Sequence, residues 1–349
     1  MGYVGPGLVE LLRRNYPDAY LIGYDMGYFA SCLTSVDYLP ETNLDLQVFG
    51  DVRQIDARIL EGVDAVVSLA AISNDPMGNK FEEITYDVNH RSTIELARMA
   101  RKAGAKSFVF ASSCSMYGAA GDLPKLESDA LNPLTAYARS KVNAEIDLSE
   151  LASNDFKISS LRFATACGMS PRLRLDLVLN DFVAGAVTAK KITILSDGSP
   201  WRPLINVKDM ARAIDWAILR KPENGGDFVA VNVGSNEWNY QVKELAEAVA
   251  DAIPGTEVFI NKDAGPDIRS YKVNFNLYKS LAPDHQPVYD LKTTIAELKD
   301  GLEKMNFTDK DFRDSRFIRL KVLASLQEKQ ALSEALQWNR KKEMIYVNQ

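Results

Sequence analysis

The chain has 349 residues, 46% of them hydrophobic, and a formal net charge of −6. It can therefore bury a large core, and its negative balance argues against nucleic acid as a partner, which needs a basic surface. Three cysteines without CxxC spacing and two histidines predict neither disulfides nor a metal site, and the short apolar runs predict a cytoplasmic protein with no membrane partner.

The chain begins with a glycine-rich turn, MGYVGPG, which leads into an amphipathic segment at 6–15. A turn of this kind, placed between a strand and a helix, lets backbone N–H groups approach a dinucleotide pyrophosphate. Asp25 follows the next apolar run, where an acidic side chain binds the adenosine ribose and repels a 2′-phosphate. Together they favour NAD over NADP. Without the glycines, Asp25 would read as an ordinary turn residue.

Short apolar runs alternate with amphipathic segments through the first half of the chain. The runs that we interpret as strands are 19–24, 46–50, 64–71, 106–113 and 158–165. The helical segments are 6–15, 80–104 and 133–153. Near-continuous apolar strands separated by helices are typical of a parallel sheet covered on both faces. We therefore expect a doubly wound α/β domain of the Rossmann type over residues 1–165.

Asp51 follows the run at 46–50 and has two interpretations. It could lie near the adenine amino group of the dinucleotide, or it could cap the helical segment that follows it. The sequence leaves both open.

The regular alternation stops after residue 165, where Pro, Arg and Gly become frequent. We expect a smaller α+β substrate domain over 166–349, with a helical tail from about residue 291. In one version of this division, residues 204–235 return to the first domain. The cleft between the two parts is the default ligand site. The tail is expected to pack on the substrate domain or at a subunit contact.

Three residues of the first half suggest acid–base chemistry. Tyr137 and Lys141 lie four apart in a predicted helix, so the ammonium can sit beside the phenol. Ser113 ends an apolar strand, and α/β folds place their chemistry at the carboxyl ends of strands. A phenol that acts near neutral pH needs its anion stabilised by a neighbouring cation. Such a group could take a proton from a secondary alcohol while hydride passes to a nicotinamide.

A series of ordered motifs makes the interpretation specific. The motifs are SLAAISNDP, DVNHRST, FASSCSMYG, YARSK, LRFATACG, SDGSPWRPLINVKDMARAI and GPDIRSY. From Gly2 to about Leu302 the chain resembles the extended short-chain dehydrogenases/reductases. Within them it resembles the NAD-dependent epimerase/dehydratase family that acts on nucleotide-diphosphate sugars.

The resemblance implies roles for residues that match the family's motifs. Tyr137 would be the acid/base, Ser113 its hydroxyl partner and Lys141 a ligand of the nicotinamide ribose. The other residues implied for NAD are Gly2, Gly5, Leu69, Ala70, Ala71 and Asn89. Helix packing is an equal alternative for Asn89.

A second group of polar residues is implied for the nucleotide-sugar substrate. Arg202 and Arg269 match two arginines that clamp the pyrophosphate, and Asn180 resembles a residue near the same phosphates. Arg172 and Arg174 are weaker candidates. The family also implies a homodimer through the helical segments at 80–104 and 133–153. Asp209 is expected to cap a helix rather than to touch a ligand.

The chain departs from the family's 4,6-dehydratases next to Ser113. Those enzymes carry an Asp-Glu pair there, whereas this chain has Cys114 and Ser115. We therefore expect chemistry at one carbinol, C-4 of the sugar. Epimerisation and a net redox step, catalysed by a 4-dehydrogenase or a 4-keto reductase, both remain open. A non-catalytic dinucleotide-binding scaffold is the alternative from another class.

The opening turn also departs from the family. Gly2 and Gly5 match the second and third glycines of GxxGxxG, but the first glycine and the strand before it are absent. In the usual strand order that strand lies at the centre of the sheet. We therefore expect a sheet whose first strand is missing.

Overall fold

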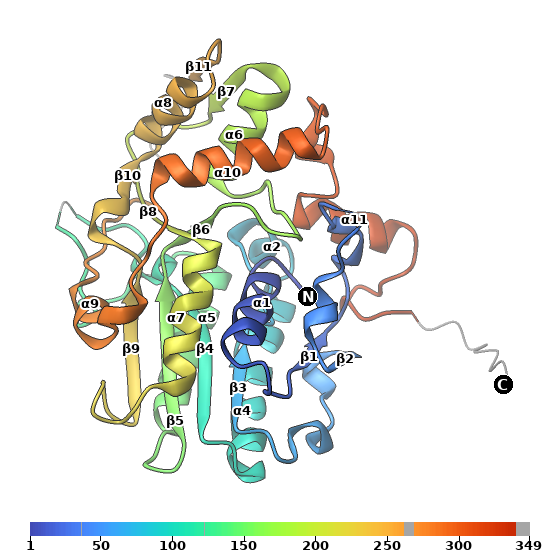
Figure 1. Cartoon of the computed structure of the whole chain (residues 1–349), viewed down its shortest axis with the longest axis vertical. Helices are drawn as coiled ribbons and strands as arrows, with labels where there is room; N and C mark the ends of the chain where they lie inside the picture. Colours follow the sequence, from blue (N-terminus) through green and yellow to red (C-terminus); the bar gives the residue numbers. More distant parts are fainter. Residues whose placement is uncertain (36, 122, 262–268, 340–349) are drawn as a thin grey trace, which may run out of the picture.

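The computed structural model describes residues 1–35, 37–121, 123–261 and 269–339. Residues 265–268 of the GPDIRSY motif lie outside these described residues. Figure 1 shows a parallel sheet with helices on both faces below a second group of helices and short strands.

A four-stranded parallel sheet forms the core of the lower part. Its order is β3-β4-β5-β9. The strands are β3 (Ala65–Ser68), β4 (Ser107–Ser113), β5 (Lys157–Phe163) and β9 (Phe228–Val233). Strand β9 joins β5, so this part of the second half of the sequence contributes to the sheet of the first half.

Alternate side chains of the sheet enter two different cores. Phe108 and Phe110 of β4 are buried against α4 (Ser92–Ala103) and α5 (Ala136–Ser149). Val109 points to the opposite face and is buried with residues of α7 (Val207–Leu219). This alternation follows from the two-residue period of a strand. It confirms the predicted α/β fold with a parallel sheet.

A separate parallel pair lies beside the four-stranded sheet. It consists of β1 (Ile22–Asp25) and β2 (Leu46–Phe49). Among the described residues, β1 pairs only with β2, and β3 pairs only with β4. The helix before β1 is α1 (Gly5–Asn15), which has a proline in its first turn and packs its apolar face against α7.

Helix α7 corrects one sequence prediction. Its N-cap is Asn206, whose side-chain oxygen accepts a hydrogen bond from Lys208 N. Asp209 lies in the first turn and accepts hydrogen bonds from the backbone N–H groups of Val288 and Tyr289. The prediction that Asp209 caps this helix was wrong because Asn206 already occupies the N-cap position. Asp209 instead ties α7 to the segment before the last long helix of the second half.

Short strands and packed helices make up the upper part. A three-stranded sheet has the order β10-β8-β6, and a parallel pair joins β7 and β11. The strands are β6 (Thr165–Cys167), β7 (Lys191–Ile194), β8 (Trp201–Asn206), β10 (Asn239–Gln241) and β11 (Glu257–Ile260). The helices are α6 (Val178–Ala189), α8 (Val242–Ala252), α9 (Asn276–Leu281) and α10 (Leu291–Lys304).

The helices between β3 and β4 run without a long loop. They are α2 (Asp75–Lys80), α3 (Glu82–Tyr86), a π-helical turn (Asp87–Arg91) and α4. Asn74 caps α2 by accepting a hydrogen bond from Met77 N. This cap fixes the start of α2, whose first residue, Asp75, follows β3 after a short loop and lines the large cavity.

The C-terminal tail packs on both parts of the molecule. Phe312 and Phe317 are buried in the core of the upper part, as expected. The following helix, α11 (Arg319–Glu328), and the residues after it instead pack on α2 and on the segment after β1. In Figure 1, α11 lies above the N-terminus and β1. The sequence did not predict this second contact.

Candidate active site

One large cavity lies at the carboxyl ends of the parallel strands. Its volume is about 1680 Å³. Residues from the ends of β1, β3, β4 and β5 line it from below, and residues of the upper part line it from above. The carboxyl edge of a parallel sheet is where α/β folds bind ligands. The cavity also continues between β1 and β3, so not all of its volume belongs to a ligand site.

The predicted catalytic residues meet in this cavity. Thr135 caps α5, which places Tyr137 and Lys141 on consecutive turns of one face. The Lys141 ammonium lies 5.9 Å from the centre of the Tyr137 ring and donates a hydrogen bond of 2.7 Å to the Ala111 carbonyl. Ser113, at the end of β4, lines the same cavity. The structure therefore brings Ser113, Tyr137 and Lys141 together.

Burial controls the protonation of this group. It raises the pKa of the Tyr137 phenol, while the hydrogen bond with Ser113 acts in the opposite direction. Burial also lowers the pKa of the Lys141 ammonium to about 7. The Ser113 hydroxyl oxygen accepts a hydrogen bond of 3.1 Å from Ser115 N. This bond fixes the oxygen beside the phenol.

The predicted dinucleotide residues lie mainly along the other end of the cavity. Gly2, Gly5, Asp25, Asp51 and the residues 69–71 line it. The Asp25 carboxylate accepts a hydrogen bond of 2.6 Å from Gly27 N, which holds it at the end of β1. Asp51 accepts a hydrogen bond from Arg53 N and caps a short 3-10 helix, which is one of the two positions that the sequence allowed. Its contact with the adenine stays a prediction.

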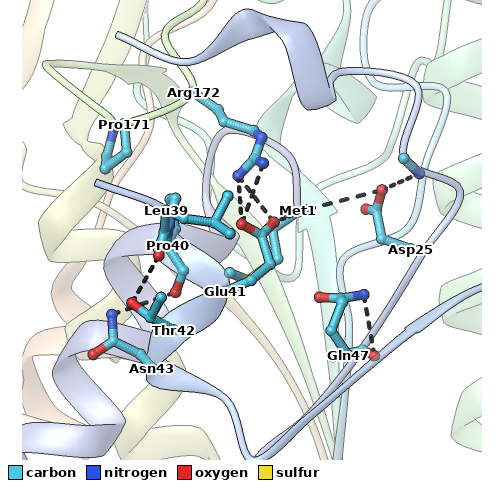
Figure 2. A network of polar contacts seen from close by, with 12 residues as sticks. Met1, Asp25, Leu39, Pro40, Glu41, Thr42, Asn43, Gln47, Pro171 and Arg172 are labelled. Atoms are coloured by element: carbon cyan, nitrogen blue, oxygen red, sulfur yellow. Dashed lines mark hydrogen bonds and ion pairs between the residues drawn. The ribbon is translucent and has the colours of Figure 1, made fainter. Parts of the chain in front are cut away.

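A network of ion pairs stands beside the glycine turn (Figure 2). Glu41 contacts the N-terminal ammonium of Met1 at 2.8 Å and the Arg172 guanidinium at 3.0 Å. Asp25 lies 4.0 Å from the same ammonium. Because Arg172 belongs to the upper part, this network joins the two parts of the molecule. Arg172 is buried with its charge engaged by Glu41, and it does not line the large cavity.

Arg202 and Arg269 both line the cavity at its upper end. The Arg202 guanidinium donates hydrogen bonds to the carbonyls of Trp201 and Arg269. Arg269 forms an ion pair of 2.6 Å with Asp75, the first residue of α2. Arg174 lines the cavity as well and pairs with Asp176 at 2.9 Å. Three arginines therefore line this end of the cavity, and two of them pair with carboxylates.

Two predicted site residues make protein contacts instead of lining the cavity. The Asn89 amide bonds to the backbone N–H and carbonyl of Ile72 and to the Ser140 hydroxyl. The Asn180 amide bonds to Gly168 and to the Arg174 carbonyl. Both side chains are fully buried. They hold segments that border the cavity, and their contact with a ligand stays a prediction.

Sequence reasoning missed Asp75 and Thr135. The Thr135 hydroxyl donates a hydrogen bond of 2.6 Å to the Asp75 carboxylate, which links α5 to α2. The signal for both was local, because Thr135 is the N-cap of α5 and Asp75 is the first residue of α2, positions where such residue types are common. Their mutual contact joins residues 60 positions apart and has no such signal.

Residues 1–234 match the family described as NAD dependent epimerase/dehydratase. The chain belongs to this family. The uncharacterized UDP-glucose epimerase YtcB of Bacillus subtilis (strain 168) is 32% identical over 250 residues, which are 70% of this chain and 74% of that protein.

Two solved structures share the fold. One is a UDP-glucose-4-epimerase from Stenotrophomonas maltophila with bound NAD and formylated UDP-arabinopyranose. It has a TM-score of 0.75 and 20% identity, and the match covers 88% of this chain and 97% of that one. The other is MoeE5 in complex with UDP-glucose and NAD, with a TM-score of 0.72, 22% identity and coverage of 87% and 96%.

The cofactor of this NAD-dependent family enzyme is NAD. The cavity fits a dinucleotide because its lining runs from the glycine turn, past Asp25 at the end of β1, to Lys141. Residues 69–71 at the end of β3 line the stretch between them. Within the described parts of the chain, no helix is long and apolar enough to cross a bilayer, and no cluster of side chains could hold a metal ion.

Proposed function

We propose that this enzyme epimerises a nucleotide-diphosphate sugar at C-4. The observation that carries the proposal is the meeting of Ser113, Tyr137 and Lys141 in one cavity with the positive charge of Arg202 and Arg269. A base beside a hydride acceptor can oxidise a secondary alcohol, and arginines suit a pyrophosphate.

Tyr137 would move the proton of the sugar hydroxyl. Burial alone keeps its phenol protonated, so its activation requires nearby positive charge. The Lys141 ammonium, close to the ring, supplies such a charge when protonated. The Ser113 hydroxyl accepts from Ser115 N and can donate its own proton to the sugar oxygen. When bound, NAD would accept a hydride from the carbinol carbon and later return it.

Arg202 and Arg269 would hold the pyrophosphate of the substrate. Guanidinium groups stay charged and match phosphate oxygens in pairs. Turning the keto sugar so that its other face meets the cofactor requires the nucleotide end to stay fixed while the sugar moves. Two arginines that line the same cavity as Tyr137 suit that requirement.

Dehydration is disfavoured by the residues around Ser113. Cys114 is fully buried and does not line the cavity, and burial raises the pKa of its thiol, so the thiol stays protonated near neutral pH and cannot act as the base. Asp75 and Asp176 are carboxylates that line this end of the cavity, but each pairs with an arginine. Elimination of water needs an acid and a base that act on neighbouring carbons.

A panel of UDP-, GDP-, CDP- and dTDP-sugars tests the proposal. Nicotinamide absorbance and product stereochemistry are followed together, with the Tyr137→Phe variant as the control. Isomerised sugar without net NADH supports the epimerase. A stoichiometric change in NADH shows a dehydrogenase or a reductase instead. No turnover on any sugar, together with intact NAD binding, favours a scaffold.

We also propose that a further parallel strand pairs between β1 and β3. Both strands have an unpaired edge in the described structure, and residues of both line the cavity between them. Val66 and Val67 of β3 are only half-buried, whereas Phe108 and Val109 of the next strand are fully buried. Unpaired backbone groups at the centre of a sheet are costly.

The strand between β1 and β3 is tested on the protein from its natural source. Its intact mass is measured, and its NADH affinity is compared with that of the 349-residue chain. A larger mass with tighter NADH binding supports the added strand. A mass that begins at Met1, with tight NADH binding, contradicts it.

A further inference from the structure

The last described part of the C-terminal tail lies against both loops that carry the predicted adenosine ligands. We call residues 329–338 the C-terminal strap. The strap folds back on itself, with a bridge between Leu332 and Trp338 and a hydrogen bond of 2.8 Å from Ser333 N to the Gln337 carbonyl. It follows α11, which packs on α2 and on Tyr28 and Phe29 of the segment after β1. The strap is therefore a compact unit next to the cofactor cavity.

The strap holds the loop after β1. The Trp338 indole N–H donates a hydrogen bond of 2.6 Å to the Met26 carbonyl, one residue beyond Asp25. The Tyr28 hydroxyl donates a hydrogen bond to the Leu336 carbonyl. The rings of Tyr28 and Trp338 are also in contact, with centres 5.8 Å apart. Three contacts thus fix the backbone that carries Asp25.

The strap also holds the loop after β2. The Arg53 guanidinium donates a hydrogen bond of 2.9 Å to the Ala335 carbonyl. The same guanidinium pairs with Asp51 at 2.6 Å. The C-terminal strap therefore links the two loops whose carboxylates are expected at the ribose and at the adenine.

Leu336 connects these contacts to the cavity. Its side chain is fully buried with Ile72 and Met77, and it forms part of the cavity lining. Its backbone has φ of 55°, in the left-handed region that a leucine rarely adopts. Such a conformation persists only where the surroundings impose it, and it is typical of ligand-binding segments.

We propose that the C-terminal strap forms the wall of the adenosine end of the NAD site and slows release of the cofactor. Leu336, buried against Ile72 and Met77, supports the cavity wall from behind, and the hydrogen bonds from Trp338 and Arg53 keep the two loops at a fixed separation. Because the strap contacts the loops after β1 and β2, its effect on NAD binding does not depend on which reaction takes place at the sugar.

The test is the rate of NADH release, followed by fluorescence after mixing the NADH complex with excess NAD. Trp338→Leu and Leu336→Ala are expected to raise the release rate about tenfold, the factor that one or two hydrogen bonds or a buried side chain supplies. Trp338→Phe keeps the ring contact but loses the N–H donor, so its effect should be smaller. Leu277→Ala, an exposed leucine on α9 away from the cavity, is the control.

Binding of two NAD fragments locates the effect. ADP-ribose should lose as much affinity as NADH in the Trp338→Leu variant, whereas nicotinamide mononucleotide should bind as in the parent protein. Trp338 is 41% exposed, so its replacement should leave the unfolding temperature of the ligand-free protein nearly unchanged even if Leu336→Ala does not fold. Unchanged NADH release in a folded Trp338→Leu variant would overturn the proposal, as would equal losses for both fragments.

Discussion

Arg269 donates to the Asp75 carboxylate over 2.6 Å, which ties an arginine of the upper part to the first turn of α2. The same carboxylate accepts the Thr135 hydroxyl at the start of the catalytic helix. The predicted substrate clamp is therefore mechanically connected to the helix that carries Tyr137. The Arg269 guanidinium is therefore already held in place by Asp75 when a substrate binds to it.

Arg269→Ala should raise KM for the nucleotide sugar by about 10- to 100-fold, because a hydrogen bond to a charged group contributes about 1.5–3 kcal/mol. Affinity for NADH should not change, since Arg269 is not among the residues predicted to contact the dinucleotide. Steady-state kinetics and NADH titration measure the two effects. Arg58→Ala is the matched control, because that arginine is exposed and does not line the cavity. An equal loss of NADH affinity would contradict the assignment.

Asp75→Asn should raise KM for the same substrate by only a few-fold, because the substitution leaves the charge of Arg269 in place and removes its ionic partner. In the Arg269→Ala background the second substitution should have little further effect, since the residue that Asp75 positions is gone. A double-mutant cycle on KM measures this coupling. Additive effects of the two substitutions would show that Asp75 acts on the substrate by a separate route.

Tyr137→Phe should reduce turnover by about 10²- to 10⁴-fold, the range for loss of a general acid–base group. Binding of NADH and of the nucleotide sugar should be nearly unchanged, because phenylalanine retains the packing of the ring. Turnover by product analysis and binding by titration separate the two effects. Tyr86→Phe removes a phenol that contacts Arg139 outside the cavity, and it should retain activity. Full turnover by the Tyr137→Phe variant would exclude this residue as the base.

The sequence predicted the parts of the site that depend on local order. Tyr137 and Lys141 were recognisable because one helical turn separates them, and Ser113 because it ends an apolar strand. The α/β fold with a parallel sheet was predictable for the same reason, since strands and helices of the first half each carry their own periodicity.

The remaining features depend on contacts between distant residues. Trp338 bonds to Met26 across 312 positions, and Asp75 pairs with Arg269 across 194. No short pattern encodes such a pair. The wrong prediction of the α7 cap has a different cause. Asn206 and Asp209 are both suitable N-cap residues, and only the position at which the backbone becomes helical determines which of them is the cap.

Lys141→Met should stabilise the ligand-free protein at neutral and acidic pH while it weakens NADH binding. Burial lowers the pKa of the Lys141 ammonium to about 7, whereas a lysine in the unfolded chain titrates near 10.4. Each unit by which a pKa moves corresponds to about 1.4 kcal/mol, and the lost hydrogen bond to Ala111 costs only about 1 kcal/mol. Replacing the lysine with methionine therefore removes the cost of burying a charge, which is larger than the cost of losing the hydrogen bond to Ala111.

The sign of the pH dependence follows from the protons that each state binds. Below about pH 7 the lysine is charged in both states, so the cost of burying its charge is present in full. As pH rises toward about 10.4, the folded protein has released this proton and the unfolded chain has not, so the cost is progressively relieved. The difference in unfolding temperature between the Lys141→Met variant and the parent protein should thus be largest near pH 6 and should shrink toward pH 10. Lys102→Met, at an exposed position of α4, should show no such trend. A variant less stable than the parent at every pH would mean that Lys141 is neutralised or paired in the ligand-free protein.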